Sequence, residues 1–572
     1  MRGEGRGITP YSIAKRQIAF GLHERNPLLR IKTLLFISPI LFLILLGINI
    51  VFVGSRPPQK VNQLVISSIG DASFLNPILA QDSASSEINS FVFNGLIKHD
   101  RDLQNLVGEL AESWKVKEGS EPEITFFLRK GVLWHDGKEF TAHDVKFTYE
   151  KIMDEKTNTV RRSSFELVKK AEVLDPYTFR VTYRQPFSPG LESWGMGIIP
   201  KHLLEKVDIN TTSFNRKPIG TGPFHFVEWV TDEKIVVEAN PKYFEGKPQL
   251  DRIIYRIIPE TSLSEMEVLT QGIDYSGVYP HQFRRMSQVP FLRAYSQPSL
   301  GYTYIGYNLK NSLFQDKRVR LALTHAINRE EIVQYVLYGL GTVASGPFPN
   351  HLWYSNPNVK PLPYDPQKAR QLLAEAGWKD KNRDGILIKD GKPFKLNLIT
   401  NSGNDTRRDV GVLVQRQLRE IGIDVTFELY EWSVFLKNFI NVKHFDACIL
   451  GWGLSVDPDA YEIWHSSQIE KGFNFISYKN SEMDRLWEEG RREYDTEKRK
   501  KIYWRIHELL AEDQPYTFLY VPLGISTLQK KFCLLEKDWT GRENVRDIKM
   551  EKAGLMYDLI KWAVPKEIVL QR

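Results

Sequence analysis

Hydrophobic residues recur along this chain with two spacings, and each spacing predicts a different element. A period of two predicts strands at residues 61–69, 124–128, 178–183, 302–308, 395–400, 425–430 and 445–452. Apolar positions three and four residues apart predict amphipathic helices at residues 85–97, 316–327, 481–494 and 496–512. Strands that alternate with helices are typical of βαβ units, so the pattern predicts an α/β fold with a mostly parallel sheet.

Two predicted helices have recognisable capping residues. Thr141-Ala-His-Asp144 matches a capping box and predicts a helix that starts there and runs to Lys151. Asp365 can cap a second helix, Pro366 suits its first position, and Gly377 can close it. Both starts are therefore expected to be well defined.

The N-terminal region differs from everything that follows. Residues 1–32 hold seven Lys and Arg against two Glu, and residues 33–55 carry no charge. About 20 apolar residues suffice to cross a bilayer, and the basic flank predicts a cytoplasmic N-terminus. We therefore expect a cytoplasmic tail (1–32), a transmembrane anchor (33–55) and a linker (56–60), with the rest outside the cytoplasm. A cleaved signal peptide is the alternative, although its apolar core is usually shorter.

Composition excludes some classes of protein. The net charge is +7, and most of it lies in the tail, so the body lacks the basic footprint of a nucleic-acid-binding protein. Only Cys448 and Cys533 are present, so at most one disulfide can form. Cys448 lies in an apolar run and is expected to be buried. Without a cysteine after the apolar segment, lipid modification of the lipoprotein kind is excluded.

Catalytic and metal-binding motifs are sparse. No nucleophile elbow, phosphate loop or zinc spacing is present, so no catalytic residue and no cofactor is assigned. His135 is expected to be a hydrogen-bonded turn residue. Asp380, Asn382 and Asp384 match the start of a calcium loop, but Gly391 stands where its glutamate is expected. A solvated turn beside a hairpin is therefore preferred over a calcium site.

Ten short motifs stand in a fixed order along the chain. They are Phe74-Leu-Asn-Pro77, Gly95-Leu-Ile97, Leu110-Ala-Glu-Ser-Trp114, 128–150, Gly220-Thr-Gly-Pro-Phe224, Arg318-Val-Arg-Leu-Ala-Leu323, Ala326-Ile-Asn-Arg329, Gly451-Trp-Gly453, Asp457-Pro-Asp459 and Gln514-Pro-Tyr516. In this order they resemble the family 5 extracellular solute-binding proteins, the peptide/nickel-binding receptors of ABC importers. The resemblance covers residues 61–564.

The resemblance implies a two-lobed periplasmic-binding-protein fold, type II-like, with an extra subdomain, here preceded by one transmembrane helix. Crossings between lobes are expected near Ser299 and Leu523, with the ligand in the cleft between lobes. The implied division is lobe I at 61–98, 216–299 and 524–572, the extra subdomain of lobe I at 99–215, and lobe II at 300–523.

In peptide-binding relatives, the resemblance implies, an aspartate three residues after the tryptophan of the Gly-Trp motif holds the peptide's amine. That position is Ser455, which cannot neutralise an ammonium group. Asp457 takes this role from a shifted loop, or the amine is held elsewhere, or the ligand is not a free-amine peptide. Asp457 followed by Pro458 is equally typical of a turn or helix cap. We call residues 451–459 the Gly-Trp loop.

Other candidate ligand contacts follow from position. Tyr302 and Tyr304 share one face of a strand just after the first crossing. Trp452 opens the Gly-Trp loop. The remaining candidates, each as suited to a core or cap position as to a ligand contact, are Ser85, Ser86 and Asn474.

These observations predict a membrane-anchored receptor that captures a solute by hinge closure outside the cytoplasm. Oligopeptides are the favoured solute, and the permease and ATPase subunits of an ABC importer are the expected partners. The receptor domain is expected to be a monomer. The alternatives are a receptor for a non-peptide solute, such as a nickel chelate or saccharide, and a sensor or enzyme built on the same fold.

Overall fold

The computed structural model describes residues 62–380, 385–537, 540 and 542–565. The predicted tail, anchor and linker lie outside this range. No helix in the described part of the chain is both long and apolar enough to cross a membrane. The chain from Asn62 onward forms one compact unit.

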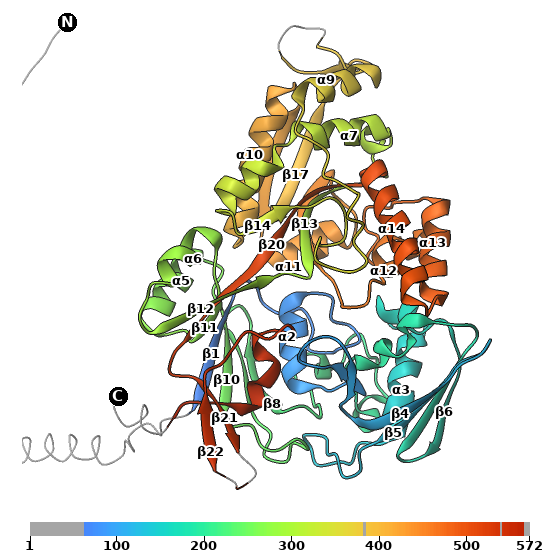
Figure 1. Cartoon of the computed structure of the whole chain (residues 1–572), viewed down its shortest axis with the longest axis vertical. Coiled ribbons are helices and arrows are strands. Elements are labelled where there is room, and N and C mark those ends of the chain that lie inside the picture. The colour runs from blue at the N-terminus through green and yellow to red at the C-terminus, as the bar shows by residue number, and fades with distance from the viewer. Residues whose placement is uncertain (1–61, 381–384, 538–539, 541, 566–572) are drawn as a thin grey trace, which may run out of the picture. The chain divides into compact units, whose positions relative to one another are not determined.

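A twelve-stranded mixed sheet runs through this unit (Figure 1). In order it contains β18 (Asp424–Tyr430), β17 (Lys395–Asn401), β19 (Ala447–Gly453), β13 (Gly301–Tyr307), β20 (Tyr516–Gln529), β11 (Tyr275–Gly277), β1 (Gln63–Ser68), β10 (Arg252–Ile257), β9 (Lys234–Ala239) and β8 (Phe224–Val230), with β12 (Leu292–Pro298) and β14 (Gly341–Val343) also paired to β20.

The expectation of a mostly parallel sheet is wrong. Parallel pairing is confined to β1 with β10 and β11, and to β17 with β18 and β19. Strands β8, β9 and β10 form an antiparallel meander, and β20 runs antiparallel to β11, β12, β13 and β14. Alternating strands and helices predicted βαβ units, but the meander and the returning strand add antiparallel neighbours.

Strand β20 is shared by two hydrophobic cores. Its first half pairs with β13, as in Tyr516 opposite Gly306, and its second half pairs with β12, from Leu523 opposite Pro298 onward. One core, in two clusters, draws its residues from 64–292 and 528–562, and we call that part lobe I. The other core, in two clusters, draws them from 302–521, and we call that part lobe II.

Lobe I carries a second, four-stranded sheet in its core. The order is β4 (Ala111–Lys117), β5 (Glu123–Leu128), β7 (Thr178–Tyr183) and β6 (Val168–Asp175), covered by α3 (Ala142–Met153). Thr141 and Asp144 form the predicted capping box at the start of α3. Figure 1 shows this sheet beside α3, below the end of lobe II that carries α13 (Ser481–Arg492).

His135 joins the segment that carries the extra sheet to the glycine loop at 220–224, and this loop lies against Val92. A Cβ on Gly220 would lie 1.8 Å from the carbonyl oxygen of Val92, so only glycine allows this close approach. His135 Nδ1 accepts a hydrogen bond from Gly220 N at 3.2 Å, and its Nε2 lies 3.0 Å from Gly222 O. The prediction of a hydrogen-bonded turn histidine is confirmed, and this motif serves the fold.

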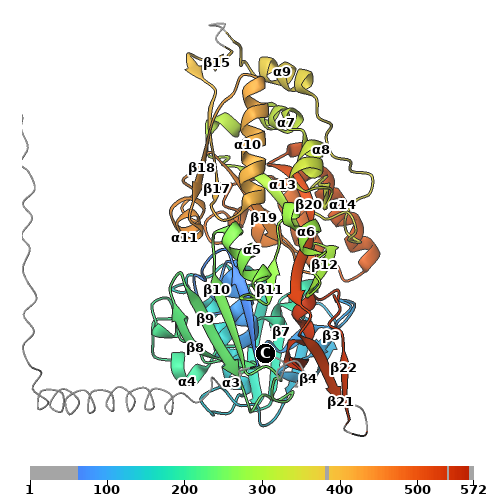
Figure 2. The same cartoon turned by 90° about the vertical axis from the view of Figure 1, so that its left-hand side faces the viewer.

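Helices cover the sheet of lobe II on both faces (Figures 1 and 2). They are α7 (Lys317–Ala326), α9 (Pro366–Glu375), α10 (Asp405–Glu420), α13 and α14 (Thr496–Asp513). Asp365 accepts a hydrogen bond from Lys368 N at 2.8 Å, as its predicted cap role requires, and Gly377 has φ +92°. The predicted helices at 481–494 and 496–512 are confirmed within two residues at each end.

Candidate functional site

The lobes contact each other at two ends of their interface. At the extra-sheet end, Ser163 and Ser164 hydroxyls donate to Glu462 Oε1 at 2.8 and 3.0 Å. Arg491 of α13 donates to Ser163 O at 2.6 Å and lies 3.3 Å from Glu166. These contacts join residues about 300 positions apart, so they exist only while the lobes are together.

The opposite end of the interface uses a smaller set of contacts. Tyr279 Oη donates to Gly403 O at 2.5 Å. A Cβ on Gly70 would lie 3.1 Å from the indole of Trp432, so lobe I presents glycine where lobe II presents an aromatic ring. This end lies at α5 (Thr261–Leu269), α6 (Pro280–Met286) and the start of α10.

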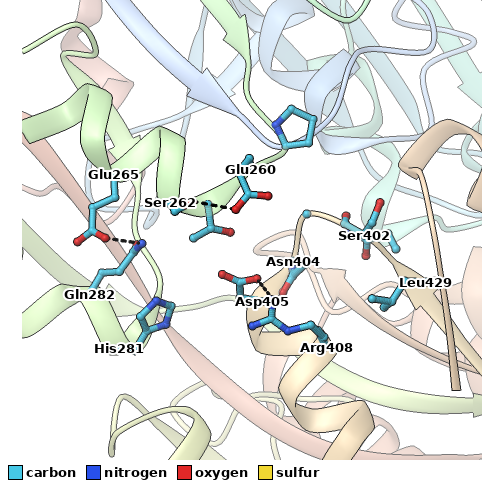
Figure 3. Close-up of a pocket in the computed structure, with 14 residues that line it drawn as sticks. Glu260, Ser262, Glu265, His281, Gln282, Ser402, Asn404, Asp405, Arg408 and Leu429 are labelled. Carbon is cyan, nitrogen blue, oxygen red and sulfur yellow. Dashed lines mark hydrogen bonds and ion pairs between the residues drawn. The ribbon is translucent and has the colours of Figure 1, made fainter. Parts of the chain in front are cut away.

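A polar pocket of about 320 Å³ opens between the lobes at this second end (Figure 3). Lobe I contributes residues of α5 and α6 to its wall, and lobe II contributes the turn that joins β17 to α10. The labelled residues in Figure 3 are Glu260, Ser262, Glu265, His281, Gln282, Ser402, Asn404, Asp405, Arg408 and Leu429. Because both lobes form the wall, the pocket exists only while the lobes are together.

The two aspartates of the Gly-Trp loop are already engaged by arginines. Arg499 of α14 donates from Nη1 and Nη2 to the two carboxylate oxygens of Asp457, at 2.6 and 2.8 Å. Arg491 Nε lies 3.2 Å from Asp459. The Asp457 and Asp459 side chains are only 13% and 15% exposed, so each pair is largely withdrawn from water. Burial raises the pKa of Asp459 to about 6, although Arg491 opposes the shift.

The rest of the loop is held by its own contacts. Ser455 is exposed, and its hydroxyl donates to Asp457 O at 2.8 Å. Half-buried Trp452 donates from Nε1 to Tyr516 Oη at 3.3 Å and lies parallel to Tyr304. Of the predicted contacts in this loop, Ser455 is the most open to the solvent.

Tyr302 and Tyr304 lie in the hydrophobic core of lobe II. They are 2% and 0% exposed, and their rings pack against Phe518 and Tyr516. The inward face of β13 that carries them is the face covered by the C-terminal helices. The structure therefore gives these two side chains a packing role.

Asn474 is likewise a structural residue in this conformation. Its side chain is fully buried, donates to the carbonyl oxygens of Trp464, His465 and Tyr478, and accepts from Tyr478 N at 2.9 Å. A buried amide with so many backbone partners fixes a turn.

Ser85 and Ser86 lie in the first turn of α2 (Ser83–Val92), which begins two residues earlier and ends five residues sooner than predicted. Asp82 is the cap residue, and Ser85 N donates to it at 2.8 Å. The Ser85 hydroxyl donates to Asp82 and accepts from Ser73 N and Phe74 N. Ser85 thus ties a loop to the helix, whereas Ser86 is exposed.

The proposed calcium loop is only partly described. Asn382 and Asp384 lie outside the described residues, and Gly385 N donates to Asp380 Oδ2 at 3.3 Å. The segment leads into a hairpin of β15 (Ile388–Lys389) and β16 (Lys392–Pro393), as the preferred alternative predicted. Among the described residues, no group of three or more acidic, His or Cys side chains is arranged to hold a metal ion.

Both cysteines are buried and free, as expected for Cys448, which is fully covered. Burial raises the pKa of both thiols.

Sequence reasoning missed Arg407. This residue lies in the first turn of α10, is half-buried, and donates from Nη1 to Asn401 Oδ1 at 2.8 Å. No acidic side chain in the described part of the chain forms an ion pair with it. An arginine at the start of a helix is expected from sequence to be solvated, and only the fold shows that its Nη2 lies beside Gly451 of β19.

Comparisons with known proteins agree with this architecture. The model of the family described as bacterial extracellular solute-binding proteins, family 5 Middle, matches residues 105–473. The oligopeptide-binding protein AppA of Bacillus subtilis (strain 168) is 39% identical over 521 residues, covering 89% of this chain and 93% of that protein.

Two solved structures extend the likeness to three dimensions. AppA from Bacillus subtilis in complex with a nonapeptide superposes with a TM-score of 0.82 at 39% identity, covering 89% of this chain and 100% of that one. NikZ from Campylobacter jejuni in complex with Ni(L-His) gives a TM-score of 0.78 at 30% identity, covering 88% and 99%. The chain therefore belongs to the family 5 extracellular solute-binding proteins and has the α/β fold of periplasmic binding proteins.

Proposed function

We propose that this protein captures an oligopeptide between its lobes and delivers it to the permease of an ABC importer. The observation that carries the proposal is the likeness to AppA, which extends over 89% of the chain and includes a structure with a bound nonapeptide. Nothing in this function requires the solute to be chemically changed.

The geometry supplies a means of capture. A solute that touches both lobes stabilises their closed arrangement, because only there do all its contacts exist together. An extended peptide would offer backbone groups that are the same for every side chain, which suits a receptor for many sequences. The polar inter-lobe pocket would accommodate part of such a ligand with its water.

We propose a hinge at the two places where the chain passes between lobes, Ser299–Leu300 and the middle of β20. The corresponding division is lobe I at 61–98, 216–299 and 524–572, an extra subdomain at 99–215, and lobe II at 300–523. The change of strand partners along β20 supports this division.

We also propose that residues 33–55 anchor the protein as a single-pass membrane helix with the N-terminus in the cytoplasm. The charge-free segment after a basic flank supports this topology. Tethering would keep the receptor close to its translocator. Membrane fractionation of the full chain and of a variant lacking residues 1–56 tests it. Release of the full chain with the soluble fraction would exclude the anchor.

A second candidate is a receptor for a non-peptide solute. The likeness to NikZ favours it, and so does the Gly-Trp loop, whose aspartates both have arginine partners. A loop without a free carboxylate does not provide the expected partner for a peptide amine.

Identification of the bound solute separates the two. The full chain would be purified in detergent, denatured, and its released small molecules identified by mass spectrometry. A mixture of short peptides supports the first function. A single non-peptide compound supports the second and rejects the peptide assignment.

A further inference from the structure

We propose that Arg407 binds a carboxylate group of the solute, so that lobe II recognises negative charge at the start of α10. The inference rests on the proposed function, since it concerns a solute held between the lobes. It names the ligand chemistry at a position that the sequence did not single out.

Arg407 has unused hydrogen-bonding capacity. A guanidinium has five N–H donors, and only one contact is formed by this one, to the neutral amide oxygen of Asn401. Each guanidinium nitrogen either has a hydrogen-bond partner or is accessible to solvent, so the remaining donors can reach a ligand. Other buried arginines are different. Arg320, for example, donates to the carbonyl oxygens of Phe314, Gln315, Asp513 and Gln514.

The position of Arg407 suits ligand binding. It follows the carboxyl end of β17, which is parallel to β18 and β19, and ligands of open α/β sheets bind beyond such strand ends. A Cβ on Gly451 would lie 3.3 Å from Arg407 Nη2, so glycine at this position lets the guanidinium lie close against β19. From lobe I, the Tyr279 hydroxyl donates a hydrogen bond to Gly403 O in the turn that precedes α10.

The charge and shape of the Arg407 guanidinium favour a carboxylate as the ligand group. The planar fork of an arginine matches a carboxylate with two parallel hydrogen bonds. Burial lowers the pKa of Arg407, and the neighbours that most oppose this shift, Tyr520, Tyr304, Tyr279 and Cys448, are neutral near pH 7. Asp405, which follows the cap residue of α10, is paired with Arg408. A carboxylate from the solute would therefore provide the missing counter-charge.

The test compares ligands that differ only in this charge. Full-length protein in detergent is titrated by calorimetry with alanine peptides of three to nine residues, each as the free acid and as the C-terminal amide. We expect the wild type to prefer the free acid by about 10- to 100-fold, since a hydrogen bond to a charged group contributes about 1.5–3 kcal/mol.

Substitution assigns the preference to one residue. Arg407→Gln is expected to bind acid and amide equally, and Arg407→Lys to retain part of the preference. The matched control is Arg416→Gln on the same helix, where the side chain is 58% exposed and pairs with Glu331. This control should behave as wild type. A preference that survives in Arg407→Gln, or is absent from the wild type, overturns the inference.

A second measurement keeps this inference separate from the peptide function. Succinate and citrate are added to each protein and the midpoint of thermal unfolding is measured. If no peptide binds but these acids stabilise the wild type and not Arg407→Gln, the peptide function fails and the inference stands. If neither peptides nor these acids bind, both are rejected. Peptides that bind equally well as acid and amide leave the function intact and overturn the inference.

Discussion

The Gly-Trp loop and the start of α10 belong to the same lobe, yet they treat charge in opposite ways. In the loop, Asp457 and Asp459 are each held by an arginine from a C-terminal helix. At α10, Arg407 has a neutral amide as its partner. A charged residue in a binding motif is therefore informative only once its partners are known, and of these three residues only the arginine lacks a counter-charge.

The largest expected effect comes from breaking the loop's best pair. Asp457→Ala should lower the free energy of unfolding by about 3–5 kcal/mol, because it leaves the Arg499 guanidinium buried without a counter-charge. Urea denaturation measures it. A loss of ligand affinity with unchanged stability would instead give Asp457 the amine-binding role. Asp457→Asn, which keeps the shape but not the charge, should show most of the same loss if the ion pair is its cause.

A pH series distinguishes the second loop aspartate. Burial raises the pKa of Asp459 to about 6, so between about pH 4 and 6 the folded protein holds a proton that the unfolded chain has released. Relative to Asp459→Asn, the wild type should lose up to about 3 kcal/mol of stability as pH rises through this window. Above about pH 7 the difference should be constant. Parallel curves across the whole range would contradict the shift.

Substitutions at the extra-sheet end of the interface should have a smaller effect. They weaken contacts between the lobes without changing the residues of the inter-lobe pocket. Replacing both Ser163 and Ser164 by Ala removes two hydrogen bonds to Glu462 that exist only between lobes. Solute affinity should fall about 5- to 30-fold, on the order of 1–2 kcal/mol. Ser193→Ala, which removes a bond within lobe I, is the control and should leave affinity unchanged. An equal loss in both proteins would assign the effect to the fold.

The smallest effect is expected from the ligand's amine. Because both loop aspartates are paired, acetylating the amine of a bound peptide should change the dissociation constant less than about threefold, or about 0.6 kcal/mol. Calorimetry with acetylated and free peptides measures it. A loss of 100-fold would show that another carboxylate holds the amine, and Glu260 in the inter-lobe pocket is the one to replace first.

Local signals predicted the elements well, but they did not predict the partners of the candidate site residues. Asp365, Thr141 and Asp316 mark helix starts correctly because capping depends on neighbours within four residues. The partners of Asp457 and Arg407 lie 42 and 6 residues away, and both pairings depend on how helices pack on the sheet. Tyr302 and Tyr304 share a face as predicted, but alternation does not tell which face looks onto the core.

The continuity of β20 has a consequence for how this protein melts. One fourteen-residue strand is hydrogen-bonded to strands of both lobes, with Pro522 near its middle. Neither lobe can unfold without breaking the hydrogen bonds that β20 forms with strands of the other lobe. We therefore expect the two lobes to unfold together, with a single cooperative peak of heat absorption. A destabilising substitution in either lobe should then lower the melting temperature of the whole protein.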